Sequence, residues 1–253
     1  MTNAILLGTL GGLVSALATT VGALPSLFKP RKGFSLITHM SMEFALGMML
    51  AAAAFSLIVP AGSEGLHRGT FGIVVISIVM GAFFIGSLGT LGERFRPQSA
   101  GEAKSVSSNA WLFIVAMMLH NLPEGLASGA ALAGLDWHKG LPVLGAIALQ
   151  NLPEGLTTAV SFRALGASKR AAFGGALVSA FVELFGGTMG GALLTMVHNV
   201  LPYLLAFAGG AMLFVATREV RERFEAVGAQ SRLKVVREIG LGMASMYVMG
   251  LLL

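Results

Sequence analysis

The sequence has no cysteine and few charged residues. Of its 253 residues only 11% are Asp, Glu, Lys or Arg, whereas 55% are apolar. Without cysteine, disulfides and thiolate metal ligands are excluded, so a metal site would need nitrogen, oxygen or thioether donors. A soluble domain carries about 25% charged residues. The shortage here predicts that most of the chain lies in lipid.

Apolar runs of about 20 residues recur along the chain, which is the pattern of transmembrane helices. They predict an all-α, polytopic membrane protein with eight transmembrane helices. We place the spans at residues 4–27, 36–60, 71–91, 108–134, 140–163, 171–196, 199–217 and 236–253. The longest polar stretch, residues 218–235, is too short to fold alone. Residues 1–253 are therefore predicted to form a single transmembrane transporter domain.

Positive charge gathers on one side of this arrangement. Lys and Arg lie mostly in four connections, near residues 28–35, 92–107, 164–170 and 218–235. These hold 15 of the 17 basic residues, all but Arg68 and Lys139. By the positive-inside rule the four connections are cytoplasmic, which puts both termini on the external side of the membrane. In a cell inner membrane that side is the periplasmic one. The basic excess is then a topology signal, and we expect lipid rather than nucleic acid as its partner.

Four of the twelve acidic residues fall within predicted spans: Glu43, Glu124, Glu154 and Glu183. A charged side chain at the bilayer centre costs about 2.5–3.5 kcal/mol on the insertion scale. No Lys or Arg is expected at midplane depth to offset that cost. Buried, unpaired carboxylates either stay protonated or bind cations. The pattern therefore predicts a proton path, a metal site, or both.

One motif is repeated on consecutive spans. The sequence Asn-Leu-Pro-Glu-Gly-Leu occurs twice, at residues 121–126 and 151–156. His120 lies four residues before Glu124, and Gln150 lies four before Glu154, so each pair shares a helix face. Each Pro frees a backbone carbonyl and kinks the helix, which makes room for a hydrated ion. Because the two spans are antiparallel, the repeat indicates an inverted repeat around a midplane site.

These side chains predict a cation-binding site inside a transporter. Asn121 and Asn151 follow the His and Gln about 100° around the helix, and Glu183 is central in the sixth span. Imidazole, carboxylate and amide oxygens suit Zn²⁺, and would also accept Fe²⁺, Mn²⁺, Cd²⁺ or Co²⁺. The metal is then the transported substrate, not a catalytic cofactor.

Two other functions are compatible with polar groups in the membrane. An intramembrane metalloenzyme would use a bound metal to activate water. However, His-x-x-x-Glu differs from the His-Glu-x-x-His motif of zinc proteases, and we do not expect an enzyme. A proton-coupled carrier of an organic solute is the second alternative, and it would need a larger polar cavity than these residues suggest.

The two signatures, residues 120–125 and 150–155, resemble those of the fourth and fifth helices of ZIP (Zrt/Irt-like) metal transporters, in the bacterial branch. The resemblance covers the whole chain and implies transport of divalent metal ions into the cytoplasm by rocking of helix groups. It also implies a binuclear centre. The implied ligands of the primary ion are His120, Glu124, Glu154 and Met49. Those implied around an adjacent ion are Asn121, Gln150, Asn151 and Glu183.

Two positions depart from the common family pattern. Many members have His where this chain has Gln150, and some have Asp where it has Asn151. Neutral amides are weaker ligands for a divalent ion, so occupancy of the second site and metal preference depend on these positions. The sequence leaves a homodimer open as the assembly.

Overall fold

The computed structural model describes residues 2–28, 34–94, 102–197 and 199–252, and within these ranges the chain is almost wholly helical. The α-helices are α1 (Thr2–Ala23), α2 (Phe34–Ala51), α3 (Val59–His67), α4 (Phe71–Arg94), α5 (Glu102–Gly134), α6 (Trp137–Ala164), α7 (Lys169–Met196), α8 (Leu201–Ala226) and α9 (Ala229–Leu252). A 3-10 turn, η1 (Leu24–Leu27), follows α1, and a π-helical segment, η2 (Ala52–Ile58), joins α2 to α3. The result is eight helical rods, which confirms the predicted all-α architecture.

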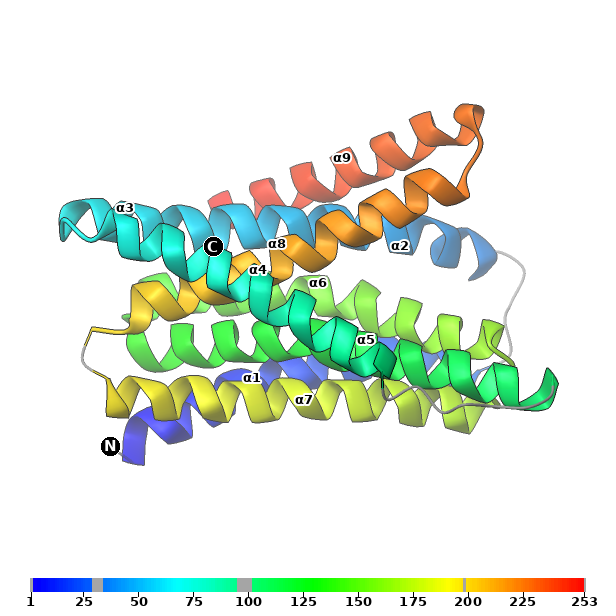
Figure 1. Cartoon of the computed structure of the whole chain (residues 1–253), viewed down its shortest axis with the longest axis horizontal. Helices are drawn as coiled ribbons and strands as arrows, with labels where there is room; N and C mark the ends of the chain where they lie inside the picture. Colours follow the sequence, from blue (N-terminus) through cyan, green and yellow to red (C-terminus); the bar gives the residue numbers. More distant parts are fainter. Residues whose placement is uncertain (1, 29–33, 95–101, 198, 253) are drawn as a thin grey trace.

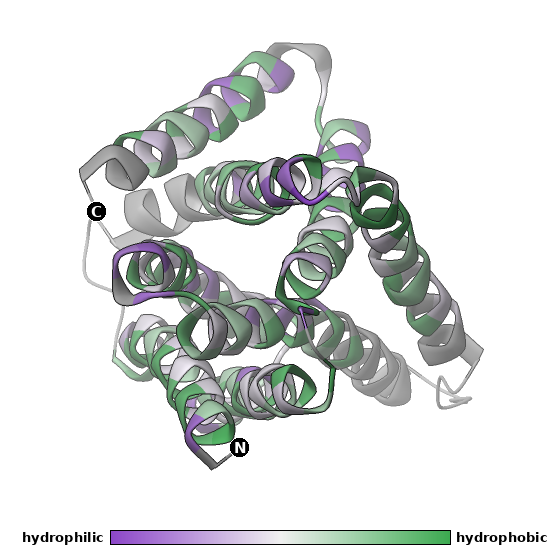
Figure 2. Ribbon diagram, turned by 90° about the vertical axis from the view of Figure 1, so that its left-hand side faces the viewer, coloured by the Kyte–Doolittle hydropathy of each residue, from purple (hydrophilic) through white to green (hydrophobic). Residues whose placement is uncertain are grey.

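The outer faces of the rods are apolar. Five helical stretches of the described chain are long and apolar enough to cross a membrane: Asn3–Leu27, Glu43–His67, Phe71–Leu88, Lys169–Met196 and Leu201–Ala226. Viewed along the bundle, most of the ribbon is hydrophobic, with hydrophilic residues in short stretches (Figure 2). On α4, large side chains such as Ile76, Val79 and Phe83 are exposed. Such a surface is unfavourable in water and favourable in lipid, as expected for a multi-pass membrane protein.

Successive rods run in opposite directions (Figure 1). Helices α1, α4, α6 and α8 begin toward one end of the bundle, and α2, α5, α7 and α9 begin toward the other. Since α9 runs back toward the end at which α1 starts, both ends of the chain lie toward the same side of the bundle. The opposite side is the one on which the sequence places most of the Lys and Arg residues.

Helix α7 packs most extensively against α1 and α5, and α6 packs against α1, so these four helices form one tight group. Glycines allow the close approach. A Cβ atom on Gly12 of α1 would lie 2.6 Å from the carbonyl oxygen of Glu183 on α7, and one on Gly8 would lie 2.6 Å from that of Gly187. Small residues at helix crossings give this contact in membranes. Outside the group, α2 packs on α9 and α4 packs on α8.

The helices extend beyond the predicted spans because apolar runs mark only the part of a helix that lies in lipid. Helix α5 begins at Glu102 rather than near 108, and α9 begins at Ala229 rather than near 236. Helix α8 continues to Ala226, nine residues past the predicted end of its span at 217. Residues 218–225, which the sequence analysis placed in a connection, are thus part of α8 and carry two i,i+4 ion pairs on its surface.

The π-helical segment η2 is a feature that the sequence analysis did not predict. It ends two residues before Pro60, which lies in the first turn of α3. Proline has no backbone N–H to donate to the preceding turn, and a wider turn is one way for a helix to accommodate that loss. By contrast, α5 and α6 continue without interruption through Pro123 and Pro153.

Candidate metal centre

Three of the predicted ligands meet in the interior of the bundle. His120 and Glu124 come from α5, and Glu154 comes from α6. The Nε2 atom of His120 lies 3.4 Å from Oε1 of Glu124 and 3.3 Å from Oε2 of Glu154. One ligand atom from each of the three residues lies within 4.8 Å of the others, and all three side chains are buried. The i,i+4 spacing on α5 and the antiparallel pairing of α5 with α6 therefore bring His120, Glu124 and Glu154 together, as the sequence predicts.

The connection between α5 and α6 sets this pairing. Only Leu135 and Asp136 separate the two helices. Asp136 caps α6, since its side chain accepts a hydrogen bond of 3.1 Å from the backbone N–H of Lys139. A capped helix after so short a connection must return beside its predecessor. The two motif copies consequently face each other across the α5–α6 contact.

The buried polar atoms of this centre are short of hydrogen-bond donors. Nδ1 of His120, Oε2 of Glu124 and Oε1 of Glu154 have no hydrogen-bond partner among the described residues. Nε2 of His120 lies near two carboxylate oxygens, at 3.4 and 3.3 Å, but the geometry there is not that of a hydrogen bond. Gln150 donates its amide N–H to Oε1 of Glu124 at 2.6 Å, and its own Oε1 is also without a partner there. A buried polar atom without a partner costs about 1–3 kcal/mol. A nitrogen and several oxygens in this condition match the donor set of a divalent cation.

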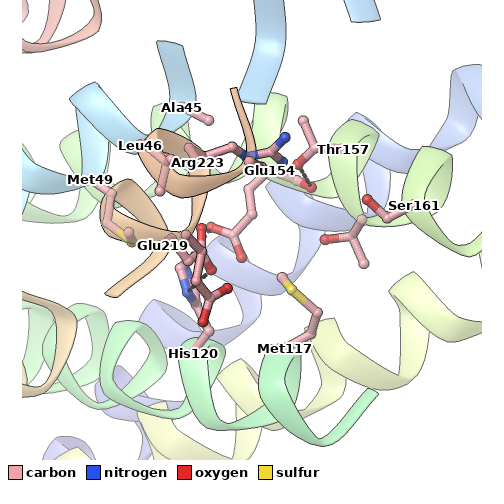
Figure 3. A pocket seen from close by; sticks show the side chains of 13 residues that line it. Ala45, Leu46, Met49, Met117, His120, Glu154, Thr157, Ser161, Glu219 and Arg223 are labelled. Atoms are coloured by element: carbon pink, nitrogen blue, oxygen red, sulfur yellow. Dashed lines mark hydrogen bonds and ion pairs between the residues drawn. The ribbon is translucent and has the colours of Figure 1, made fainter. Parts of the chain in front are cut away.

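A cavity of about 360 Å³ lies beside the centre, between α2, α5, α6 and α8. Figure 3 shows Glu154 and Glu219 pointing toward His120, with Met49 and Met117 at the cavity wall. The predicted ligand Met49 is therefore in the same cavity as two of the clustered residues. Glu124 is fully buried and is not among the residues that line it.

Glu219 was missed by the sequence analysis, which placed it in a cytoplasmic connection. Its Oε1 lies 3.7 Å from Nδ1 of His120, on the side of the ring opposite to Glu124 and Glu154. A helical pattern could have found it. Met212 and Ala216 are buried on α8, and Glu219 and Arg223 continue the same face at steps of three and four residues. A charged residue on that stripe points into the bundle.

One of the residues that line the cavity, Arg223, forms an ion pair between two helices. The guanidinium Nη1 of Arg223, on α8, lies 4.0 Å from Oε1 of Glu43 on α2. Glu43 was one of the four acidic residues expected to lack a basic partner, and for this residue the expectation is wrong. The helical continuation of α8 past its apolar run explains the difference, since it carries Arg223 to the level of α2.

The remaining predicted residues gather at a second place. Glu183 of α7 accepts hydrogen bonds from Asn121 at 2.8 Å and from Asn151 at 2.7 Å. It also accepts from the hydroxyl groups of Ser15 and Thr19 on α1. All five side chains are buried. The sequence analysis did not anticipate the two hydroxyl residues, since a Ser or Thr in an apolar helix ordinarily bonds its own backbone.

The chain was compared with known proteins. A family model described as ZIP Zinc transporter matches residues 93–250. Zinc transporter ZIPB of Bordetella bronchiseptica is 36% identical over 219 residues, which cover 83% of this chain and 70% of that protein. Zinc transporter GufA of Myxococcus xanthus is 36% identical over 221 residues, covering 84% and 86%. Zinc transporter ZIP11 of Xenopus tropicalis is 34% identical over 153 residues, covering 56% and 46%.

Proposed function

The chain belongs to the ZIP zinc transporter family, and on this premise we propose that it carries a divalent metal ion across a membrane through the centre of His120, Glu124 and Glu154. The observation that supports this site is its buried imidazole and carboxylate groups, several of whose atoms have no hydrogen-bond partner in the described part of the chain. A cation would satisfy them at once. The chain is then a carrier and not an enzyme, with the metal as its substrate.

The proposed ligands are one imidazole and two carboxylates. Met49, at the cavity wall, and the free Oε1 of Gln150 are available to complete the coordination. Three or four nitrogen and oxygen ligands suit tetrahedral Zn²⁺, the ion in the names of the similar curated proteins. Fe²⁺, Mn²⁺, Cd²⁺ and Co²⁺ accept the same donors, so we propose that the centre takes several of them.

The cavity suggests the route by which the ion leaves. From His120 it extends along α8 past Glu219 and Glu222 to Ala226, the last residue of that helix. This end of α8 precedes a connection rich in Lys and Arg, which the positive-inside rule assigns to the cytoplasm. We therefore propose import, across the inner membrane, in a protein with both termini outside.

The ligands come from two sets of helices, and this suggests how access alternates. His120, Glu124 and Glu154 belong to α5 and α6, which pack in the tight group with α1 and α7. Met49 and Glu219 reach the same cavity from α2 and α8. If α2 and α8 rock against the group, Met49 and Glu219 move relative to the centre and the cavity beside it opens or closes. His120 and both carboxylates keep their mutual positions during this motion.

Uptake into vesicles reconstituted with the purified protein tests the proposal. We expect accumulation of Zn²⁺ above that of empty vesicles, and smaller accumulation of the other four metals. Glu124→Ala should remove uptake, because it deletes a buried carboxylate of the centre. The matched control is Glu225→Ala, which removes an exposed carboxylate paired with Arg221 at 2.7 Å and should leave uptake unchanged. Uptake by a well-folded Glu124→Ala protein at the wild-type rate would refute the site.

A further inference from the structure

We infer that Glu183 is not a metal ligand in this chain but the acceptor at the middle of a hydrogen-bond hub, and that the metal centre consequently holds one ion per chain. The hub consists of Glu183 with its four donors: Ser15, Thr19, Asn121 and Asn151. The inference rests on the proposed function, since it counts the ions that a transport centre binds. It departs from the binuclear centre that the family resemblance implies.

The acceptor positions of Glu183 are all occupied. An ionised carboxylate has about four lone-pair positions, two on each oxygen. Oε1 accepts from Thr19 Oγ1 at 2.5 Å and from Asn121 Nδ2 at 2.8 Å. Oε2 accepts from Asn151 Nδ2 at 2.7 Å and from the Ser15 hydroxyl. A metal ion could bind this carboxylate only by displacing hydrogen bonds that already satisfy it.

The two amides also point the wrong way for a second ion. A carboxylate can only accept, so Asn121 and Asn151 must turn their NH₂ groups, not their oxygens, toward Glu183. Asn151 Nδ2 lies in addition 2.8 Å from Oγ of Ser15. The space around the Glu183 carboxylate itself is therefore lined by N–H and O–H donors, whose positive ends repel a cation. The Oδ1 atoms of Asn121 and Asn151 are buried without a hydrogen-bond partner among the described residues, but they belong to the ends of the amides that do not contact Glu183. This donor set does not fit a metal.

The glycines of the repeated motif assemble the hub. Gly125, in the first copy, is packed against the backbone of Glu183, where a Cβ atom would not fit. Gly155, in the second copy, is packed in the same way against the backbone of Thr19. These contacts draw α7 and α1 onto the two motif helices. In each motif copy the Glu side chain thus lies in the metal centre, whereas the Asn side chain and the Gly backbone contact the residues of the hub.

Asn151 is the residue that decides between a hub and a second site. An Asp at this position would donate nothing to Glu183, and two carboxylates would face each other in the protein interior. Like charges so placed are relieved either by a proton on one carboxyl group or by a cation between them, and at alkaline pH the proton is the weaker competitor. Asn151→Asp should therefore create a binding site for a second ion, with no change at His120, Glu124 or Glu154.

Metal content per chain tests the inference. Purified protein is dialysed to equilibrium against excess Zn²⁺, and bound metal is measured by mass spectrometry against protein concentration. We expect one ion in the wild type, two in Asn151→Asp, and one in Glu183→Gln. Glu154→Gln, which neutralises a proposed ligand, should lose the ion. Thr19→Val removes a single hub donor and should keep one ion even if the Glu183 variant does not fold.

Several results would overturn the hub. These are two ions in the wild type, one ion in a folded Asn151→Asp protein at alkaline pH, or loss of the ion in folded Thr19→Val or Glu183→Gln. Failure of the proposed function looks different: the wild type would bind no ion, or Glu154→Gln would bind as the wild type does. Size-exclusion profiles and thermal unfolding of each variant separate a lost site from a lost fold.

Discussion

The metal centre, with two buried carboxylates, and the hub, with one, lie in the same bundle and differ in their supply of hydrogen-bond donors. At the metal centre, Glu124 accepts one hydrogen bond, from the side-chain amide of Gln150. Oε2 of Glu124 and Oε1 of Glu154 have no hydrogen-bond partner among the described residues. At the hub, Glu183 receives four donors from three helices. All three carboxylates come from apolar spans, and two are completely inaccessible.

The proposed metal centre differs from the hub in its shortage of donors. A cation can make up such a shortage, whereas an apolar environment cannot. His120 and Asn121 illustrate this at neighbouring positions. Since they are adjacent on α5, they diverge by about 100°. The imidazole turns to Glu124 and Glu154, whereas the amide turns to Glu183.

Protons should affect the metal centre most strongly. A proton and a metal ion compete for the same lone pairs, so each proton displaced on binding weakens the apparent affinity about tenfold per pH unit of acidification. Binding should be tightest at high pH and weaken as the pH falls from about 8 to 5.5, since imidazole protonates in water at about pH 6.5. Titration with Zn²⁺ at fixed free-ion concentrations measures this. A flat affinity over that range would contradict a centre made of His120 and two carboxylates.

The hub should contribute stability and leave metal affinity nearly unchanged. Thr19→Val keeps the shape of the side chain but deletes a hydroxyl bonded to a carboxylate, which costs about 1.5–3 kcal/mol. Thermal unfolding without metal measures the loss. The control is Thr217→Val on α8, whose hydroxyl bonds only its own helix and whose loss should change stability by no more than about 0.5 kcal/mol. A Thr19→Val protein that keeps its stability but loses Zn²⁺ affinity would contradict the distinction between hub and metal centre.

The clustering of His120, Glu124 and Glu154 in the candidate metal centre could be predicted from the sequence because its signal is local. His120 and Glu124 lie on one helix face at i,i+4, and the repeated motif supplies the antiparallel partner. The count of eight helices followed from the apolar runs for the same reason. These patterns need only the helical period and the length of a membrane span.

The rest depended on contacts between distant parts of the chain. Ser15 and Glu183 are 168 residues apart, and no pattern in either segment predicts their contact. Glu219 was assigned to a connection because charge begins where the apolar run of α8 ends, although the helix continues. The orientation of Asn121 and Asn151 was also beyond sequence reasoning, since an amide serves equally as metal ligand or as donor.

Glu219 should have a moderate effect on turnover. A carboxylate beside the second nitrogen of a metal-binding imidazole orients the ring, and removing it typically costs 10–100-fold. The 3.7 Å separation from His120 is too long for a full hydrogen bond. We therefore expect Glu219→Gln to lower the uptake rate by about three- to tenfold. Glu222→Gln is the control, because that residue lines the same cavity but pairs with Arg218 at 2.9 Å. Equal rates in both variants would remove Glu219 from the mechanism.

An effect of similar size, on metal selectivity and not on rate, is expected at Gln150, which separates the centre from the common family pattern. Its N–H is committed to Glu124, and its carbonyl oxygen is buried without a partner among the described residues. Gln150→His would offer a nitrogen donor, which late first-row metals prefer to a neutral oxygen. Zn²⁺ should then bind more tightly relative to Mn²⁺, by about threefold to tenfold, and leave more slowly. Equilibrium binding of both metals measures the ratio, with Gln150→Asn as the amide control. An unchanged ratio would mean that position 150 faces away from the ion, and that Gln150 serves only to hold Glu124 in place.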